Sequence, residues 1–298
     1  MIEFPVILGP DGRPIVMQKN THPAIYLDTW ALRLFAEGEP ALGQRFRDAL
    51  LRVRGTLMLS HLSFGEFTSF DDPRHARSVG AFVDSINPHI FFSQFDPFQV
   101  IPAEYSTIAG QRNGTPAGDV RLLDLYAARR TGPRHPSISD WFDYSTDRAQ
   151  YRAAIDEMAQ RFLNGIAELR NRFAAEPDFV KLALENVKVS TLPRITQALL
   201  RALIYWLDPK MTLDVNDALD IAHCIVPAAY ADFVLLDRRW YVRLKDAEGF
   251  LRSIDIETRI AEQYTQRDGG VLNFLERLEA WPPKPEARTR SAMLGGIT

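Results

Sequence analysis

Short apolar runs without polar alternation occur at three places along the chain. They cover residues 24–27, 56–60 and 233–236. A strand that is buried on both faces has this pattern, because helices cover both sides of a parallel sheet. Between the first two runs, Leu42 and Phe46 belong to a series of apolar residues spaced by three or four, which predicts an amphipathic helix. Strand, helix and strand in this order form a βαβ unit, so the pattern predicts an α/β fold with a parallel sheet flanked by helices.

Helical spacing dominates the rest of the chain. Apolar positions from 155 to 173 predict one long amphipathic helix, and shorter helices are expected at 179–187 and 195–206. A further helix is expected at 215–226, ended or kinked by Pro227. These helices separate the third apolar run from the first two.

The order of these patterns predicts a discontinuous core. We expect an α/β core formed by residues 1–70 and 208–280, in which the first twenty residues form a hairpin or arm. Residues 71–207 are expected to form a mostly helical insertion between the two halves, with strands returning only after it. The Pro-rich and Gly-rich segment 281–298 is expected to be a flexible tail.

Acidic residues follow the apolar runs. Asp28 comes directly after the first run, Asp237 comes directly after the third, and the second run leads into a segment that contains Glu66. The helix before the third run adds Asp217 and Asp220, which lie one turn apart and therefore on one face. Ligands of open α/β sheets bind beyond the carboxyl ends of the strands. We therefore expect these carboxylates to converge at one edge of the sheet.

A cluster of four or five carboxylates indicates a site for divalent cations. Without a cation, mutual repulsion would raise some of the carboxyl pKa values and leave those groups protonated. Mg²⁺ and Mn²⁺ prefer oxygen ligands of this kind. Such ions activate water and stabilise the leaving oxygen when a phosphodiester bond is cleaved, and this chemistry needs no nucleophilic side chain. The sequence therefore predicts a metal-dependent hydrolase that acts on phosphodiesters.

Three segments resemble the motifs of the PIN-domain (PilT N-terminal) nucleases. AIYLDTWALRLF is similar to the family's first strand with its terminal Asp, here Asp28. TLMLSHLSFGEF resembles the second motif, a strand ending in Ser or Thr and then a Glu, here Ser60 and Glu66. NDALDIAHCIVPAAYADFVLLDRRWY resembles the closing block, a helix with an acid and then a strand ending at Asp237. The resemblance covers mainly residues 24–70 and 212–245.

The resemblance implies a PIN-like fold, a metal site and a nuclease activity. Asp28, Glu66, Asp220 and Asp237 would be catalytic and would hold one or two Mg²⁺ or Mn²⁺ ions, with RNA expected in preference to single-stranded DNA. The family's spacing also admits Asp217 as the helix acid, either as a metal ligand or as a partner of one. Many relatives act as toxins or in phage defence, and a toxin-like nuclease needs an inhibitory partner protein.

Each acid also has a purely structural interpretation. Asp28 is a good N-cap for a following helix, and Asp217 is favoured near a helix N-terminus by the helix dipole. Glu66 fits a solvated helix position, and Asp237 fits a turn. His223 and Cys224 lie beside the acids and fit packed helix positions, although a hydrogen bond from His223 to a metal ligand remains open.

Basic residues provide candidates for binding of the nucleic-acid backbone. The net charge of −3 excludes a uniformly basic surface, but residues 108–205 carry fourteen Arg and Lys against eleven Asp and Glu. Arg129 and Arg130 belong to the densest basic cluster, and Arg238 and Arg239 adjoin the predicted site. The alternative is that these arginines are solvated surface residues of amphipathic helices.

Cysteine content and hydropathy bear on the cellular location. Cys224 is the only cysteine, which excludes an intrachain disulfide framework and a cysteine zinc cluster. No signal peptide is recognised and no apolar run is long enough to span a membrane, so we expect a cytoplasmic protein. The sequence leaves the oligomeric state open, including a homo-oligomer.

Two other classes of function share features with this sequence. One is a PIN-like interaction module, with weak catalysis and a protein partner docked on the helical insertion. The other is a Mg²⁺-dependent phosphatase of the haloacid dehalogenase type. That family has a second Asp two residues after the first one, and Trp30 stands at that position here.

Overall fold

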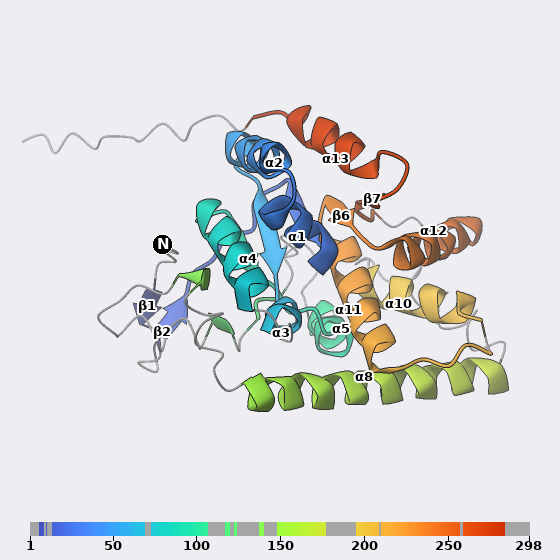
Figure 1. Cartoon of the computed structure of the whole chain (residues 1–298). Helices are drawn as coiled ribbons and strands as arrows, with labels where there is room; N and C mark the ends of the chain where they lie inside the picture. The colour runs from blue at the N-terminus through green and yellow to red at the C-terminus, as the bar shows by residue number, and fades with distance from the viewer. Residues whose placement is uncertain are drawn as a thin grey trace, which may run out of the picture.

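A five-stranded parallel sheet forms the centre of the molecule (Figure 1). The computed structural model describes residues 6–8, 10, 14–68, 73–106, 117–119, 122–123, 137–139, 148–176, 195–208, 210–256 and 259–283. The strands, in their order across the sheet, are β5 (Ile90–Phe92), β4 (Thr56–Leu59), β3 (Ala24–Leu27), β6 (Phe233–Leu235) and β7 (Glu262–Tyr264). All four neighbouring pairs are parallel. The predicted α/β class with a parallel sheet flanked by helices is therefore confirmed.

Side chains alternate between the two faces of the sheet, and each face has its own core. On one face, Ile25 and Leu27 of β3 pack in a cluster with helices α1 (Thr29–Glu37), α2 (Pro40–Val53), α4 (Pro73–Ser85) and α13 (Gly270–Glu279). On the other face, Ala24 and Tyr26 pack in a cluster with α5 (Pro97–Ser106), α8 (Arg148–Ala175), α10 (Ile195–Trp206), α11 (Val215–Tyr230) and α12 (Arg238–Ser253). Burial of the strands on both faces explains their unbroken apolar runs.

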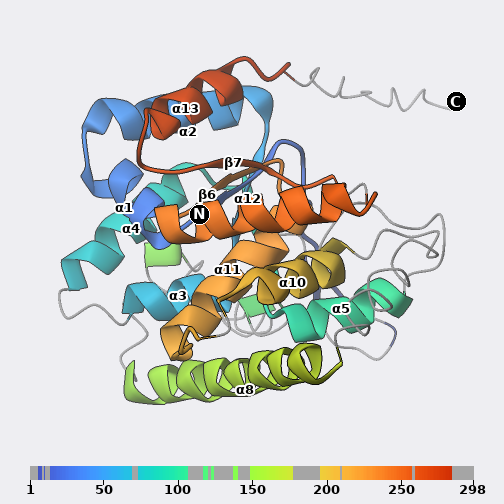
Figure 2. The same ribbon diagram turned by 90° about the vertical axis from the view of Figure 1, so that its right-hand side faces the viewer.

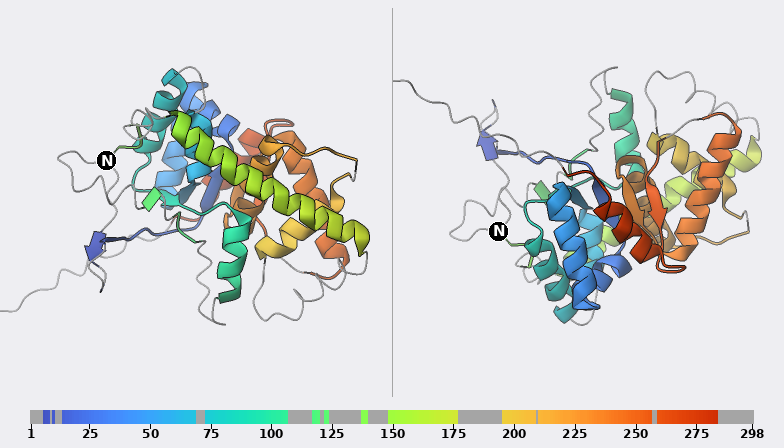
Figure 3. Two further views of the ribbon diagram at one scale, coloured as in Figure 1. Left: turned by 90° about the horizontal axis from the view of Figure 1, so that it is seen from below. Right: turned by 90° about the horizontal axis from the view of Figure 1, so that it is seen from above.

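The layers are visible in the two side views. Figure 2 shows α13 and α2 together on one side of the sheet, with α12, α10 and α11 on the other and the long α8 as the outermost element. Seen from below, α8 runs across the width of the molecule (Figure 3). The short helix α3 (His61–Thr68) contributes Leu62 to one core and Phe64 and Phe67 to the other. It therefore lies at the end of the sheet, where the two cores meet.

Chain order across the sheet creates a switch point at β3. From β3 the chain passes to β4 and β5 on one side, and it later returns to β6 and β7 on the other side. The connections after β3 and β6 therefore lead away from each other. A crevice beyond the carboxyl ends of such neighbouring strands is the usual place for a ligand in an open α/β sheet.

The expected hairpin near the start of the chain is also present. Strands β1 (Val6–Leu8) and β2 (Pro14–Val16) pair antiparallel in a separate two-stranded sheet. No described helix of the chain is long and apolar enough to cross a membrane.

Two expectations about secondary structure are wrong. A strand, β5, lies within residues 71–207 and pairs with β4, so this segment contributes to the central sheet. Of the two alternatives expected for Pro227, only the helix end is wrong, because α11 continues to Tyr230. One further turn follows the proline, and the amide of Ala231 donates to the Pro227 carbonyl with an N–O distance of 2.8 Å.

Several predicted features lie outside the described residues. These are the helix expected at 179–187 and the tail from 284 onward. The helices expected within 155–173 and at 195–206 are confirmed as α8 and α10.

Candidate metal centre

Two of the predicted acids stand at the carboxyl ends of neighbouring strands. Asp28 follows β3, and its amide donates to the Leu235 carbonyl of β6 over 3.0 Å. Asp237 follows β6 after one intervening residue. Each also caps a helix: the Asp28 carboxylate accepts from the Thr29 amide at 2.7 Å, and the Asp237 carboxylate accepts from the Trp240 amide at 3.0 Å. The capping interpretation of Asp28 is therefore correct, whereas Asp237 caps a helix and does not open a turn. One carboxylate oxygen of each is not used by the cap.

Helix α3 brings Glu66 to the same end of the sheet. The Thr29 hydroxyl, next to Asp28, donates a short hydrogen bond to the Glu66 carboxylate. The Glu66 side chain is 24% exposed. Glu66 is therefore a partly buried group that faces Asp28, and the interpretation as a solvated helix residue is wrong.

Burial and mutual repulsion leave these two carboxylates poorly ionised near neutral pH. Burial, followed by the nearby Glu66, raises the pKa of Asp28 to about 7. Burial also raises the pKa of Glu66 to about 7. Carboxyl pKa values in this range mean that neither group has a cationic partner strong enough to offset its desolvation.

The choice between the two helix acids depends on their partners. Asp217 forms an ion pair with Arg239 at 2.6 Å and exchanges capping hydrogen bonds with Asp214 at the start of α11. Asp220 accepts from the Trp240 indole nitrogen at 2.7 Å. Burial raises the pKa of Asp220 to about 6, and Glu66 contributes to this increase. Asp220 therefore shares the electrostatic environment of the other acids, whereas Asp217 is neutralised by an arginine.

His223 lies one turn beyond Asp220 on α11 and faces the acids. Its Nδ1 lies 2.8 Å from the Tyr26 hydroxyl and 3.6 Å from a Glu66 carboxylate oxygen. One ligand atom from each of Asp28, Glu66 and His223 falls within 4.8 Å of the others. Asp237 and Asp220 act on this group through electrostatic interactions, since Asp220 raises the pKa of Asp28 and Asp237 raises that of Asp220.

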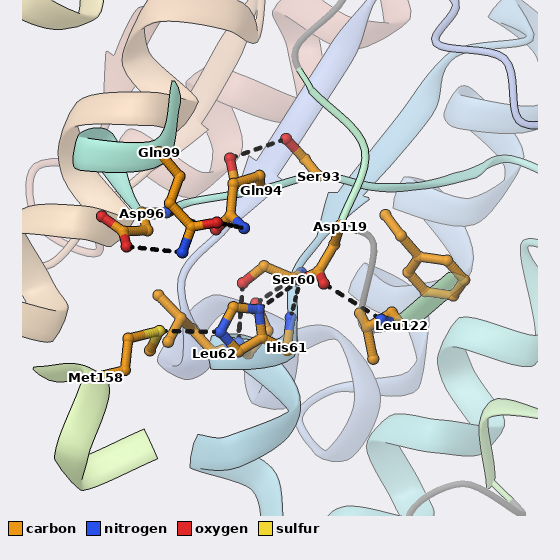
Figure 4. Close-up of polar contacts among 12 residues, drawn as sticks. Ser60, His61, Leu62, Ser93, Gln94, Asp96, Gln99, Asp119, Leu122 and Met158 are labelled. Atoms are coloured by element: carbon orange, nitrogen blue, oxygen red, sulfur yellow. Dashed lines mark hydrogen bonds and ion pairs between the residues drawn. The ribbon is translucent and has the colours of Figure 1, made fainter. Parts of the chain in front are cut away.

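A second buried network holds helix α3 in place (Figure 4). Asp119, fully buried, accepts from the His61 amide at 2.8 Å and lies 2.5 Å from His61 Nδ1. The other ring nitrogen of His61 contacts the Met158 sulfur on α8 at 3.1 Å. Asp119 itself is positioned by its amide, which donates to the Phe92 carbonyl of β5. This network fixes the first residue of the helix that carries Glu66.

Sequence patterns did not identify that network, because its members are far apart in the chain. His61 and Asp119 are separated by 58 residues, and Asp119 lies in a segment without a recognisable pattern. The one sequence feature that pointed to His61 is its position directly after Ser60, which ends the strand of the second motif.

An open cavity of about 280 Å³ adjoins the acids. It lies between α3, α8 and α11, and Glu66 and Asp220 line it together with Gly65, Ile155, Asp156, Asn216 and Leu219. A ligand in this cavity contacts two of the predicted site carboxylates.

The arginines predicted to bind substrate are only partly described. Arg238 and Arg239 begin α12 and are exposed, with Arg239 paired to Asp217 and lying 5.3 Å from the Trp240 ring centre. Arg129 and Arg130 lie outside the described residues. Cys224 is a buried free thiol in the core, as its packed interpretation requires.

The donor set is suited to a divalent cation. Carboxylate oxygens of Asp28 and Glu66 and a neutral imidazole are all divalent-metal ligands. Burial lowers the pKa of His223, which keeps the ring neutral. A cation among these groups would favour the ionised carboxylates that burial disfavours.

Comparison with known proteins found no relative of this chain. No protein-family model matches the chain, and no curated protein or solved structure matches it either.

Proposed function

We propose that this chain is a metal-dependent nuclease of the PIN-like type, with its helical segment inserted between the two halves of the PIN-like core. It hydrolyses phosphodiester bonds, with RNA preferred to single-stranded DNA. The observation that carries the proposal is the group of Asp28, Glu66 and His223 within 4.8 Å, at the end of the sheet where three motifs resemble those of the PIN nucleases.

In this proposal four of the carboxylates bind metal ions and the fifth binds an arginine. Asp28, Glu66, Asp220 and Asp237 hold one or two Mg²⁺ or Mn²⁺ ions, and Asp217 pairs with Arg239 at the rim. A bound divalent ion supplies an activated water and stabilises charge on the leaving oxygen. The helix caps at Asp28 and Asp237 hold their carboxylates at the strand ends, so little conformational entropy is lost when a ligand binds.

Surrounding groups determine how the substrate approaches. The cavity beside Glu66 and Asp220 admits a phosphodiester to the acids from one side. Arg238 and Arg239 are exposed at the N-terminus of α12, where basic side chains and the helix dipole both favour phosphate. A flexible single strand fits such an approach better than a rigid duplex, and the preference for RNA rests on the resemblance of the three motifs.

Cleavage assays with purified full-length protein test the proposal. Fluorescent RNA and single-stranded DNA are incubated with Mn²⁺ or Mg²⁺ and the wild type, Asp28→Asn or Asp237→Asn. We expect metal-dependent cleavage that falls by at least about 100-fold in both variants, because a lost metal ligand removes several kcal/mol of transition-state stabilisation. Asp48→Asn, at an exposed position on α2, is the matched control and retains activity.

Other outcomes separate the alternatives. Cleavage that survives chelation of divalent ions, or that is unchanged in Asp28→Asn, contradicts the proposal. Metal binding at these residues without cleavage of either nucleic acid would instead favour a PIN-like module that docks a protein partner.

A further inference from the structure

His223 is a buried polar side chain directed into the acid cluster. Its side chain is 4% exposed, and its Nδ1 lies 3.6 Å from the Glu66 carboxylate. The ring also packs edge-on against Tyr26 and Phe95, with centroid distances of 5.9 Å to each. These contacts hold the imidazole in one orientation.

Packing alone does not explain a histidine at this position. The second ring nitrogen, Nε2, is buried and has no hydrogen-bond partner among the described residues. A buried polar atom without a partner destabilises the folded state, because its desolvation is not compensated by a hydrogen bond. An apolar side chain of similar size would avoid this loss but would leave the buried Tyr26 hydroxyl without its partner, so this position favours a ring with a polar atom on its Nδ1 side.

The distances fit those between ligands of one metal ion. Divalent ions bind oxygen and imidazole nitrogen at about 2.0–2.2 Å, so neighbouring ligands in a six-coordinate site lie about 3 Å apart and opposite ones about 4 Å apart. The Nδ1–Glu66 distance of 3.6 Å lies between these values. The full group of three, within 4.8 Å, requires only a small contraction around an ion.

We infer that His223 Nδ1 is a direct nitrogen ligand of the metal held by Asp28 and Glu66, and that this ligand makes the site select Mn²⁺ over Mg²⁺. The inference rests on the proposed metal-dependent function. Imidazole binds transition-metal ions well, whereas Mg²⁺ strongly prefers oxygen ligands and retains its waters.

Tyr26 prepares the imidazole for this role. Its hydroxyl lies 2.8 Å from Nδ1, and when the ring carries its proton on Nε2 the hydroxyl donates this hydrogen bond to Nδ1. The tautomer with its proton on Nε2 is the one that can bind a cation through Nδ1.

Pulsed electron paramagnetic resonance of bound Mn²⁺ tests the inference directly. A coordinated histidine nitrogen produces a hyperfine coupling that changes when ¹⁵N-histidine replaces the natural isotope. We compare the full-length wild type with His223→Gln and with His75→Gln, a half-exposed histidine that contacts Glu37 outside the site. We expect a nitrogen coupling in the wild type and in His75→Gln, and its loss in His223→Gln.

Metal affinities give a second readout. Replacement of residues that hold a metal site together typically weakens its metal affinity by about 10–100-fold. We expect a decrease of this size in the affinity for Mn²⁺ when His223 is replaced in His223→Gln. The affinity for Mg²⁺ should change by less than about threefold, because Mg²⁺ gains little from an imidazole ligand. Tyr26→Phe removes the hydrogen bond but keeps the ligand, so it retains the nitrogen coupling.

The outcomes distinguish this inference from the proposed nuclease activity. Bound Mn²⁺ without a histidine coupling in the wild type overturns the inference, whatever the cleavage assay shows. A histidine coupling in a protein that cleaves no nucleic acid supports the inference and contradicts the nuclease. If His223→Gln does not fold, isotope labelling of the wild type and Tyr26→Phe still decide the result.

Discussion

Replacement of Asp28 by Asn is expected to stabilise the metal-free protein above neutral pH. Burial and the neighbouring Glu66 raise the pKa of Asp28 from 3.8 to about 7. Since folding raises this pKa, the stability contributed by protonated Asp28 is fully present below pH 3.8 and is lost as the pH rises through about 7. Asn never ionises, so the variant does not lose this contribution. Asn is also an equivalent N-cap, so the bond from the Thr29 amide is retained.

The magnitude follows from the pKa. A change of about three pKa units at about 1.4 kcal/mol per unit sets a ceiling of about 4 kcal/mol. Asp28 is partly exposed, and water reduces the penalty of its ionised form. We therefore expect Asp28→Asn to exceed the wild type by about 2 kcal/mol in free energy of unfolding at about pH 8.5, with little difference at about pH 3.5.

Urea denaturation with a chelator present, followed by tryptophan fluorescence, measures this difference. Asp48→Asn, whose side chain is 60% exposed, is the control and should match the wild type at both pH values. Added Mn²⁺ should reverse the order, because a ligand that binds the folded state stabilises the wild type more than a variant that lacks a ligand. An Asp28→Asn variant that is less stable than the wild type at high pH with chelator would refute the reasoning.

Three further substitutions probe the supports of the site. Trp240→Phe removes the indole donor of Asp220, so we expect a higher carboxyl pKa by NMR titration and a loss of about 1–3 kcal/mol in unfolding free energy. Asp119→Asn weakens the buried bonds to His61 and should lower stability by a similar amount in thermal denaturation, about 1–3 kcal/mol. Arg239→Ala leaves the buried Asp217 carboxylate without its arginine, so stability should fall by about 1–3 kcal/mol, and RNA affinity in a filter-binding assay should fall as well. An unchanged Asp220 pKa, an Asp119→Asn variant as stable as the wild type, or an undiminished RNA affinity would contradict the respective argument.

Local pattern alone was enough to predict the centre of the sheet. β3 and β6 are apolar throughout, and β4 is apolar after Thr56, because both of their faces are covered; such runs are visible without any knowledge of the fold. Parallel strands place their carboxyl ends together, so the expectation that Asp28 and Glu66 meet followed from the order of elements. Helical spacing likewise predicted α8 and α10.

The edge strands needed the tertiary structure. β7 has the sequence Glu-Gln-Tyr, with an exposed first residue, and it is a strand because its backbone pairs with β6. β5 is only three residues long and lies within a largely helical region. Short runs of this kind fit several structures, and the partner strand decides between them.

Long-range contacts also decided the role of each acid on α11. Asp217 and Asp220 look equivalent in sequence, and Arg239 neutralises the first while Trp240 and Glu66 surround the second. The position of His223 opposite Glu66 depends on how α11 packs against α3 and β3. The sequence by itself determined which residue types the site contains, because the order of elements along the chain and the spacing of residues on a helix can be read directly from it. Only the tertiary structure decided which of them face one another, because that depends on packing between separate elements of the chain, such as α3 and α11.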